Sequence, residues 1–116
     1  AILYIDDDSA TLKPFKQILE FQGFIVMTSE SSEEGLKTLQ KGEISCVVCD
    51  GVAQRNRVEE FCHRNDIGFC LFSGDETEVQ FETSVVITKG QKETLDELKA
   101  FCQVYEAKEG RDKFEL

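Results

Sequence analysis

The chain contains no tryptophan, one proline, one histidine and one methionine in 116 residues. Basic residues are also scarce: 13 Lys and Arg stand against 23 Asp and Glu, which gives a net charge of -10. This shortage excludes the basic face that grips a nucleic-acid backbone, so we expect no direct nucleic acid binding by this domain. No apolar run approaches the roughly 20 residues that span a membrane, and no secretory leader pattern is visible. We therefore expect a cytoplasmic module that makes no membrane contact.

The cysteines are few and odd in number, which excludes a complete disulfide framework. Five occur, mostly within apolar runs, and we expect reduced thiols that pack as small hydrophobic side chains. Cys46 and Cys49 form a C-x-x-C pair, but residues three apart on a strand point to opposite faces. This pair is therefore not expected to chelate a metal. The remaining cysteines are Cys62, Cys70 and Cys102.

Strand-like and helix-like segments alternate along the chain, which is typical of a parallel sheet with helices on both faces. Its length allows one domain with one core, which we place at residues 1–106. Residues 107–116 are predicted to form a charged C-terminal tail or the start of a linker. The apolar runs predict strands at residues 2–5, 24–28, 44–49, 67–72 and 85–87.

Helical periodicity fills the segments between these strands. The first helix is expected to end at Gly23 and contains the single proline, Pro14, as a tolerated irregularity near its start. Ser31 and Glu34 form a capping-box signal for the second helix. The third is expected at residues 57–65. The last is expected to start near Gln91 and to bury Leu95, Leu98, Phe101, Cys102 and Tyr105.

Carboxylates stand where two of the predicted strands end. Asp6 and Asp7 follow the first strand directly, and Asp50 follows the third. Because the carboxyl ends of parallel strands meet at one edge of an open sheet, where ligands bind, we expect these side chains to lie together. Several carboxylates cannot share a small site as bare anions, so a proton or a cation must sit among them. The sequence thus predicts an acidic pocket for a hard divalent metal.

Two further strands end in residues that suit phosphoryl chemistry. Ser73 follows the fourth strand and Lys89 follows the fifth. An aspartate such as Asp50 can carry an acyl phosphate, while a hydroxyl and an ammonium group bind phosphoryl oxygens. A divalent cation neutralises the same oxygens. These residues therefore indicate a phosphoryl-transfer site gathered from separate strands.

In these segments the chain resembles the receiver domain of two-component response regulators, of the chemotaxis-regulator type. The resemblance runs from Ile2 to about Tyr105. It implies a flavodoxin-like, doubly wound α/β fold with five parallel strands in the order 2-1-3-4-5. It also implies a phosphorelay switch that phosphorylates and dephosphorylates itself, free-standing or within a hybrid histidine kinase, rather than a metabolic enzyme. The matching segments are Ile2-Leu3-Tyr4-Ile5-Asp6-Asp7-Asp8, Val47-Val48-Cys49-Asp50, Leu71-Phe72-Ser73-Gly74 and Val86-Ile87-Thr88-Lys89.

The resemblance implies a Mg²⁺ site built from four residues. Asp7 and Asp50 would bind the ion directly, together with the backbone carbonyl of Val52. Asp6 would act mostly through water, and Asp8 would be a flanking acid.

It also implies how the phosphoryl group is received. Asp50 would accept it from a sensor histidine kinase or a histidine phosphotransfer domain. Ser73 would move toward the phosphoryl group, and Lys89 would pair first with Asp50 and then with that group. Val52 and Asp75 occupy the positions that tune hydrolysis in the family, and an apolar Val52 cannot orient an attacking water, so we expect a phosphoryl group that is not short-lived.

The chain departs from the family on its output side. Asp50 is not followed by the usual Met-Pro pair, and Lys89 is followed by Gly90 in place of the usual proline, which forms a cis bond. The segment from Ser73 to Lys89 is short, so we expect the fourth helix to be short or missing. Val86 replaces the usual switch aromatic. These departures are compatible with two further partners. One is an output domain in the same chain, and the other is a second copy in a homodimer that uses a non-standard face.

Two alternatives remain at this stage. One is a degenerate receiver that acts as a phosphorylation-independent interaction or dimerisation module, which the missing Met-Pro, Lys-Pro and switch aromatic favour. The other is a small aspartate-nucleophile phosphatase, because Asp6-x-Asp8 is similar to the haloacid dehalogenase motif. That motif requires a threonine or similar residue where this chain has Ala10, and the chain lacks a cap domain.

Overall fold

The computed structural model describes residues 1–74 and 78–114. It contains a five-stranded parallel sheet in the order β2-β1-β3-β4-β5, which confirms the predicted strand order. The strands are β1 (Ile2–Ile5), β2 (Val26–Ser29), β3 (Cys46–Cys49), β4 (Gly68–Ser73) and β5 (Val85–Thr88). The helices are α1 (Ser9–Phe21), α2 (Ser32–Leu39), α3 (Arg55–Arg64) and α4 (Thr94–Phe114).

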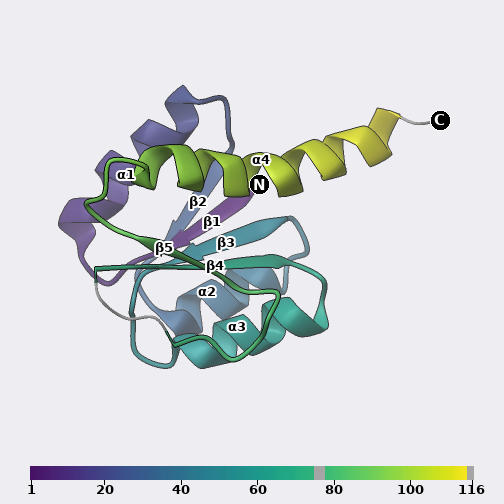
Figure 1. Cartoon of the computed structure of the whole chain (residues 1–116). Helices are drawn as coiled ribbons and strands as arrows, with labels where there is room; N and C mark the ends of the chain where they lie inside the picture. The colour runs from purple at the N-terminus through teal and green to yellow at the C-terminus, as the bar shows by residue number, and fades with distance from the viewer. Residues whose placement is uncertain (75–77, 115–116) are drawn as a thin grey trace.

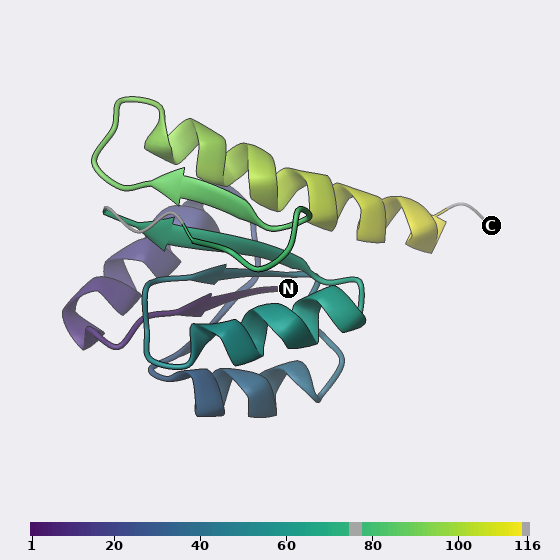
Figure 2. The same cartoon turned by 60° about the horizontal axis from the view of Figure 1, so that its bottom comes forward.

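The helices form a layer on each face of the sheet. Helices α1 and α4 cover one face and α2 and α3 the other (Figures 1 and 2). Side chains alternate between the two faces along every strand. Cys46 packs in the core beneath α1 and α4, and Cys49 packs in the core beneath α2 and α3. The prediction that these two cysteines point to opposite faces is therefore confirmed.

Capping residues mark where the first two helices begin, and a glycine follows the end of α1. Asp8 caps α1, because its carboxylate accepts a hydrogen bond from the amide of Ala10 at 3.0 Å. Ser31 caps α2 by accepting from the amide of Glu34 at 3.1 Å, as predicted. Gly23 follows α1 with φ +98°, a conformation that side-chain-bearing residues rarely adopt. Pro14 lies inside α1, one turn later than expected.

The connection from β4 to β5 contains no helix among its described residues, 74 and 78–84. This confirms the expectation that the fourth helix is short or missing, since none lies in these residues. The last helix, labelled α4, therefore takes the place of the fifth helix of that fold. Ends of elements otherwise shift by one to three residues: β2 starts at Val26 and α4 at Thr94.

One predicted core residue is wrong. Leu95 lies in the first turn of α4 and is 44% exposed, because the inward-facing stripe of that helix begins one turn later, with Leu98. Phe101 and Cys102 are buried as expected, and Tyr105 is partly buried. The helix continues to Phe114, past the expected domain end at residue 106.

The described part of the chain has no helix with the length and apolar character needed to cross a membrane.

Candidate functional site

Asp50 lies just beyond β3, at the carboxyl edge of the sheet. Its amide donates to the carbonyl of Ile5 at 2.9 Å, which continues the pairing of β3 with β1. One carboxylate oxygen, Oδ1, accepts from the amide of Gly51 at 2.8 Å, and the other, Oδ2, lies 2.7 Å from Nζ of Lys89. The side chains of Asp50 and Lys89 are 22% and 31% exposed, so a reactant can reach the pair.

Lys89 lies one residue beyond β5, next to the end of β4. Its amide donates to the carbonyl of Ser73 at 2.9 Å, which extends the pairing of β5 with β4. The peptide bond between Lys89 and Gly90 is trans, and Gly90 follows with φ +76°. The sheet therefore places Lys89 opposite Asp50 without the cis bond expected for the family.

Ser73 ends β4 between these two residues and is 6% exposed. The strand order puts β4 between β3 and β5, so the sheet brings Ser73, Asp50 and Lys89 to one edge. These are the three residues for which the sequence predicted phosphoryl chemistry. Asp75, which together with Val52 occupies a position expected to tune hydrolysis, lies outside the described residues.

Asp6 follows β1 and is almost fully buried, with 1% of its surface exposed. Its Oδ2 accepts hydrogen bonds from the hydroxyl groups of Thr11 and, at 3.1 Å, Tyr4. Its Oδ1 accepts from the amide of Asp8 at 2.9 Å. Burial pushes the pKa of Asp6 upward, but these donors and the charge of Lys89 outweigh it and hold the pKa below its ordinary value. Asp6 is therefore a stable, ionised carboxylate at this edge.

Asp7 and Val52 complete the predicted metal ligands and differ in their surroundings. The side chain of Asp7 is exposed, whereas that of Val52 is 4% exposed and packs in the core beneath α2 and α3. The amide of Val52 donates to the carbonyl of Asp50 at 2.7 Å. Its carbonyl accepts a 3.3 Å hydrogen bond from the amide of Arg55, at the start of α3. A metal ion bound to this carbonyl would have to share it with that amide.

The donors at this edge suit Mg²⁺ in chemistry, because carboxylate and carbonyl oxygens are its preferred protein ligands. Within residues 1–74 and 78–114, no group of three or more His, Cys, Asp or Glu side chains is placed to hold a metal ion. The ligand set that the family resemblance implies needs only two carboxylates in direct contact, from Asp7 and Asp50, and does not depend on such a group. Asp6, which already accepts three hydrogen bonds, suits a role through water.

Sequence reasoning missed the hydroxyl groups that hold Asp6. Tyr4 reads as an apolar strand residue and Thr11 as a polar position on a helix, and neither identity predicts a contact with Asp6. The signal available in the sequence is the place of Tyr4, a residue with a polar hydroxyl group, in the apolar run two residues before Asp6. Asp8, interpreted as a flanking acid, caps α1 and also donates its amide to Asp6.

Receiver domains are among the solved structures that share this fold. A response regulator receiver domain from Clostridium thermocellum is 25% identical, with a TM-score of 0.70 over 93% of this chain and 95% of that chain. The response regulator TrrA from Thermotoga maritima, solved in complex with Mg²⁺ and BeF, is 21% identical, with a TM-score of 0.68 over 86% and 96%. The signal receiver domain of an HD domain-containing protein from Pseudomonas fluorescens is 14% identical, with a TM-score of 0.73 over 95% and 96%.

No family model and no curated protein matches the chain. The fold is that of a response regulator receiver domain, which confirms the resemblance seen in the sequence.

Proposed function

We propose that this chain is a phosphorelay switch in which Asp50 accepts a phosphoryl group from a histidine kinase or a histidine phosphotransfer protein. The observation that carries the proposal is the 2.7 Å pair between Asp50 Oδ2 and Lys89 Nζ, at a reachable sheet edge beside Ser73. An ammonium group in this place offsets the charge of Asp50 before the reaction and that of the phosphoryl oxygens after it.

The chemistry is a nucleophilic substitution at phosphorus. A carboxylate oxygen of Asp50 forms a new O–P bond, and the N–P bond of the donor phosphohistidine breaks, so that the imidazole leaves with the bonding electron pair. Lys89 pairs with an oxygen of the transferred group, and the hydroxyl of Ser73 donates to another. Hydrolysis of the acyl phosphate returns Asp50 to its carboxylate, so the domain turns over only its own phosphoryl group.

The proposal includes Mg²⁺, held by Asp7, Asp50 and the carbonyl of Val52, with Asp6 acting through water. The ion would supply positive charge to the phosphoryl oxygens. The complex of TrrA with Mg²⁺ and BeF supports this by analogy of fold. The net charge of -10 also favours binding of a cation at this edge.

The proposed partners follow from the same site. A cytoplasmic histidine kinase or phosphotransfer protein delivers the phosphoryl group. An output domain in the same chain is proposed because a receiver of this fold occurs in an HD domain-containing protein. The proposed homodimer would use a face other than the usual one, since the fourth helix that builds the usual face is missing from the described part of the β4–β5 connection.

Intact mass after incubation with acetyl phosphate and Mg²⁺ tests the proposal. We expect wild-type protein to gain one phosphoryl group and Asp50→Asn to gain none, because the substitution removes the nucleophilic oxygen. We expect wild type without divalent metal to gain none either. Asp66→Asn is the matched control, because Asp66 is exposed, lies beyond the far end of β4 and has a positive φ that asparagine tolerates.

Each outcome decides between two functions. Uptake by wild type and Asp66→Asn, but not by Asp50→Asn, supports the phosphorelay switch. A folded wild-type protein that binds Mg²⁺ and gains no phosphoryl group would overturn it.

The second candidate is the phosphorylation-independent interaction module. One observation favours it: the described residues 78–84 of the β4–β5 connection are fastened to α3 by hydrogen bonds. Glu59 of α3 accepts hydrogen bonds from the amides of Gln80 and Phe81 at 2.8 and 3.1 Å and from the hydroxyl of Ser84 at 2.6 Å. A segment held in this way resists conformational change, as expected for a module that does not switch. If wild-type protein gains no phosphoryl group, this candidate replaces the phosphorelay switch.

A further inference from the structure

The ring of Phe72 lies beneath the ammonium group of Lys89. Phe72 is the next-to-last residue of β4, is 1% exposed and faces the core beneath α1 and α4. Nζ of Lys89 lies 5.3 Å from the centroid of this ring. A cation within about 6 Å of the centroid and over the face of an aromatic ring is attracted by the electron density of that face.

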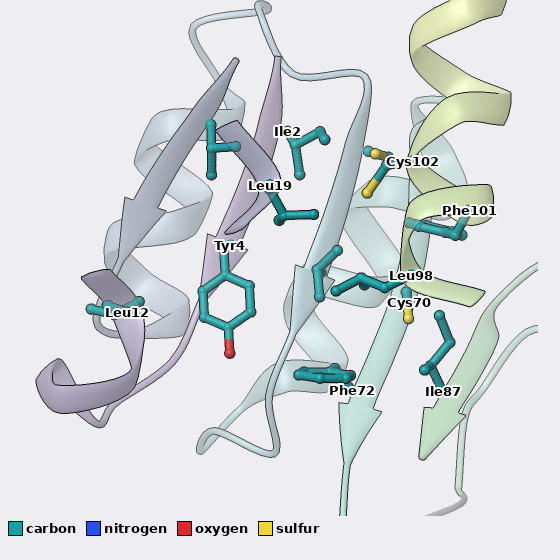
Figure 3. Packing of buried hydrophobic residues seen from close by; sticks show 13 residues of the cluster. Ile2, Tyr4, Leu12, Leu19, Cys70, Phe72, Ile87, Leu98, Phe101 and Cys102 are labelled. Atoms are coloured by element: carbon teal, nitrogen blue, oxygen red, sulfur yellow. The ribbon is translucent and has the colours of Figure 1, made fainter. Parts of the chain in front are cut away.

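Two other aromatic rings fix the orientation of Phe72. Phe15 of α1 packs edge-on against it, with centroids 5.2 Å apart and an interplanar angle of 80°. Tyr4 of β1 approaches it at 6.5 Å and 66°, and Tyr4 and Phe15 stack on each other at 5.4 Å. Figure 3 shows Tyr4 and Phe72 side by side near the carboxyl ends of their strands. Buried rings with such edge-to-face contacts have little freedom to turn, so the face below Lys89 is a fixed surface.

This aromatic cluster, Tyr4, Phe15 and Phe72, reaches both charged sides of the site. The hydroxyl of Tyr4 donates to Asp6, and the face of Phe72 attracts Lys89. Lysine has a flexible four-carbon chain, and Lys89 is 31% exposed, so Asp50 alone would leave its ammonium group a wide range of positions. Attraction to the ring narrows the range of positions of the ammonium group. It leaves the N–H groups of Lys89 available for hydrogen bonds to Asp50 or to a phosphoryl oxygen.

We propose that Phe72 is a positioning residue for phosphoryl transfer, which acts by holding the ammonium group of Lys89 over its ring face. This inference rests on the proposed function and deepens it. In the reaction, Lys89 moves its hydrogen bond from Asp50 to the phosphoryl group. The ring gives the ammonium group a constant neighbour during that exchange, in a chain where the bond after Lys89 is trans.

Fluorination of the ring separates electrostatics from packing. Phenylalanine at position 72 is replaced by its 4-fluoro, 3,5-difluoro and 3,4,5-trifluoro analogues, which keep the ring in place but weaken the negative face stepwise. We expect the initial rate of phosphoryl uptake from acetyl phosphate with Mg²⁺ to fall with each fluorine, and Phe72→Leu to lower it by roughly three- to thirtyfold, as loss of a cation–π contact predicts. A ring that only fills the core would leave the rate unchanged across the fluorinated series.

Phe69 provides the matched control. It lies on the same strand, is 3% exposed and packs on the opposite face, beneath α2 and α3. The same fluorinated series and Phe69→Leu should leave the uptake rate within about twofold of wild type, whatever they do to stability. In a Lys89→Met background, Phe72→Leu should slow uptake no further, because the group through which it acts is gone. Equal effects at positions 69 and 72, or additive effects with Lys89→Met, would overturn the inference.

A second measurement does not require phosphorylation. The ε-methylene protons of Lys89 should show an upfield ring-current shift in the NMR spectrum of wild type, which Phe72→Leu removes and Phe69→Leu retains. No phosphoryl uptake by wild type together with the shift would overturn the proposed function while Phe72 still positions Lys89. Uptake without the shift, or with a shift that Phe72→Leu leaves intact, would overturn the role of Phe72 alone.

Discussion

At the acidic edge of the sheet, the charge of a buried carboxylate depends on the hydrogen-bond donors around it. Asp6 is buried beside Asp50, and a carboxylate in that place without donors would become protonated. Instead, it accepts two hydroxyl groups and one amide, which keep it charged. Among these donors, Tyr4 is the one that can be removed with little change of shape, because phenylalanine keeps the ring and its stacking on Phe15.

We expect Tyr4→Phe to lower the free energy of unfolding by about 1–2 kcal/mol at pH 7, because Asp6 loses one charge-assisted hydrogen bond. The folded-state pKa of Asp6 lies below its unfolded value, so its contribution is full above that value and disappears as the pH falls through the lower one. The difference between variant and wild type should therefore shrink below the ordinary aspartate pKa of about 3.9. Urea titrations at pH 7 and pH 3 measure this, and a difference that does not depend on pH would contradict it.

At the scale of elements, residues 78–84 stand in the connection where the expected fold has its fourth helix, and they are fastened to α3. Glu59 is 3% exposed and accepts the three hydrogen bonds described above from Gln80, Phe81 and Ser84. The ring of His63, one turn further along α3, stacks on Phe81 with centroids 3.9 Å apart. The segment is thus attached by a buried carboxylate at one point and by stacked rings at another.

Glu59→Gln should destabilise the fold by about 1–2 kcal/mol, because all three donors bond to one carboxylate oxygen, Oε2, and a neutral amide oxygen in its place accepts weaker hydrogen bonds. Glu60→Gln is the matched control: Glu60 is the neighbouring residue, forms only an exposed pair with Arg64 and should change stability by less than about 0.5 kcal/mol. Thermal or urea unfolding of the three proteins measures both effects. Equal loss in the two variants would mean that Glu59 does not fasten the segment.

The sequence allowed the missing helix to be predicted but not what replaced it. The short distance from Ser73 to Lys89 leaves little room for a helix with two loops, so chain length alone predicts a helix that is short or missing. Glu59 stands between Val58 and Glu60 in a polar helix and has no pattern that marks it as buried. His63 is exposed, and its stacking on Phe81 joins segments that only the folded chain brings together.

In the candidate site, too, some contacts follow from the sequence and others do not. Asp50, Ser73 and Lys89 each end or follow a strand, so strand order alone predicts that they meet. The contacts of Tyr4 with Asp6 and of Phe72 with Lys89 depend on side-chain directions within the core beneath α1 and α4, which periodicity does not specify.

At the scale of the whole molecule, two cores lie on opposite faces of the sheet and contain every cysteine. Cys46, Cys70 and Cys102 lie in one core and Cys49 and Cys62 in the other, all as free thiols. Burial raises the pKa of Cys62 and of Cys70 to about 12. The thiolate is the reactive form, so the native protein should present almost none at neutral pH.

We therefore expect Ellman's reagent to modify almost no thiol of the native protein at pH 8 and all five after denaturation in guanidinium chloride. The two reactions, followed by absorbance, also report whether a core variant remains packed. Rapid modification of one or more thiols in the native protein would show that a core opens more readily than its burial indicates.

The buried carboxylate of Glu59 also has a consequence for the order of folding. Before residues 80–84 are in place, that carboxylate must keep its water, so the inner face of α3 cannot close fully on the sheet. On a ribosome, α3 is synthesised about twenty residues ahead of the donors it needs, as the separations of 21, 22 and 25 positions indicate. Packing of α3 on the sheet is therefore delayed until the chain beyond Ser84 has left the ribosome. In a nascent chain that stalls earlier, α3 would remain loosely packed.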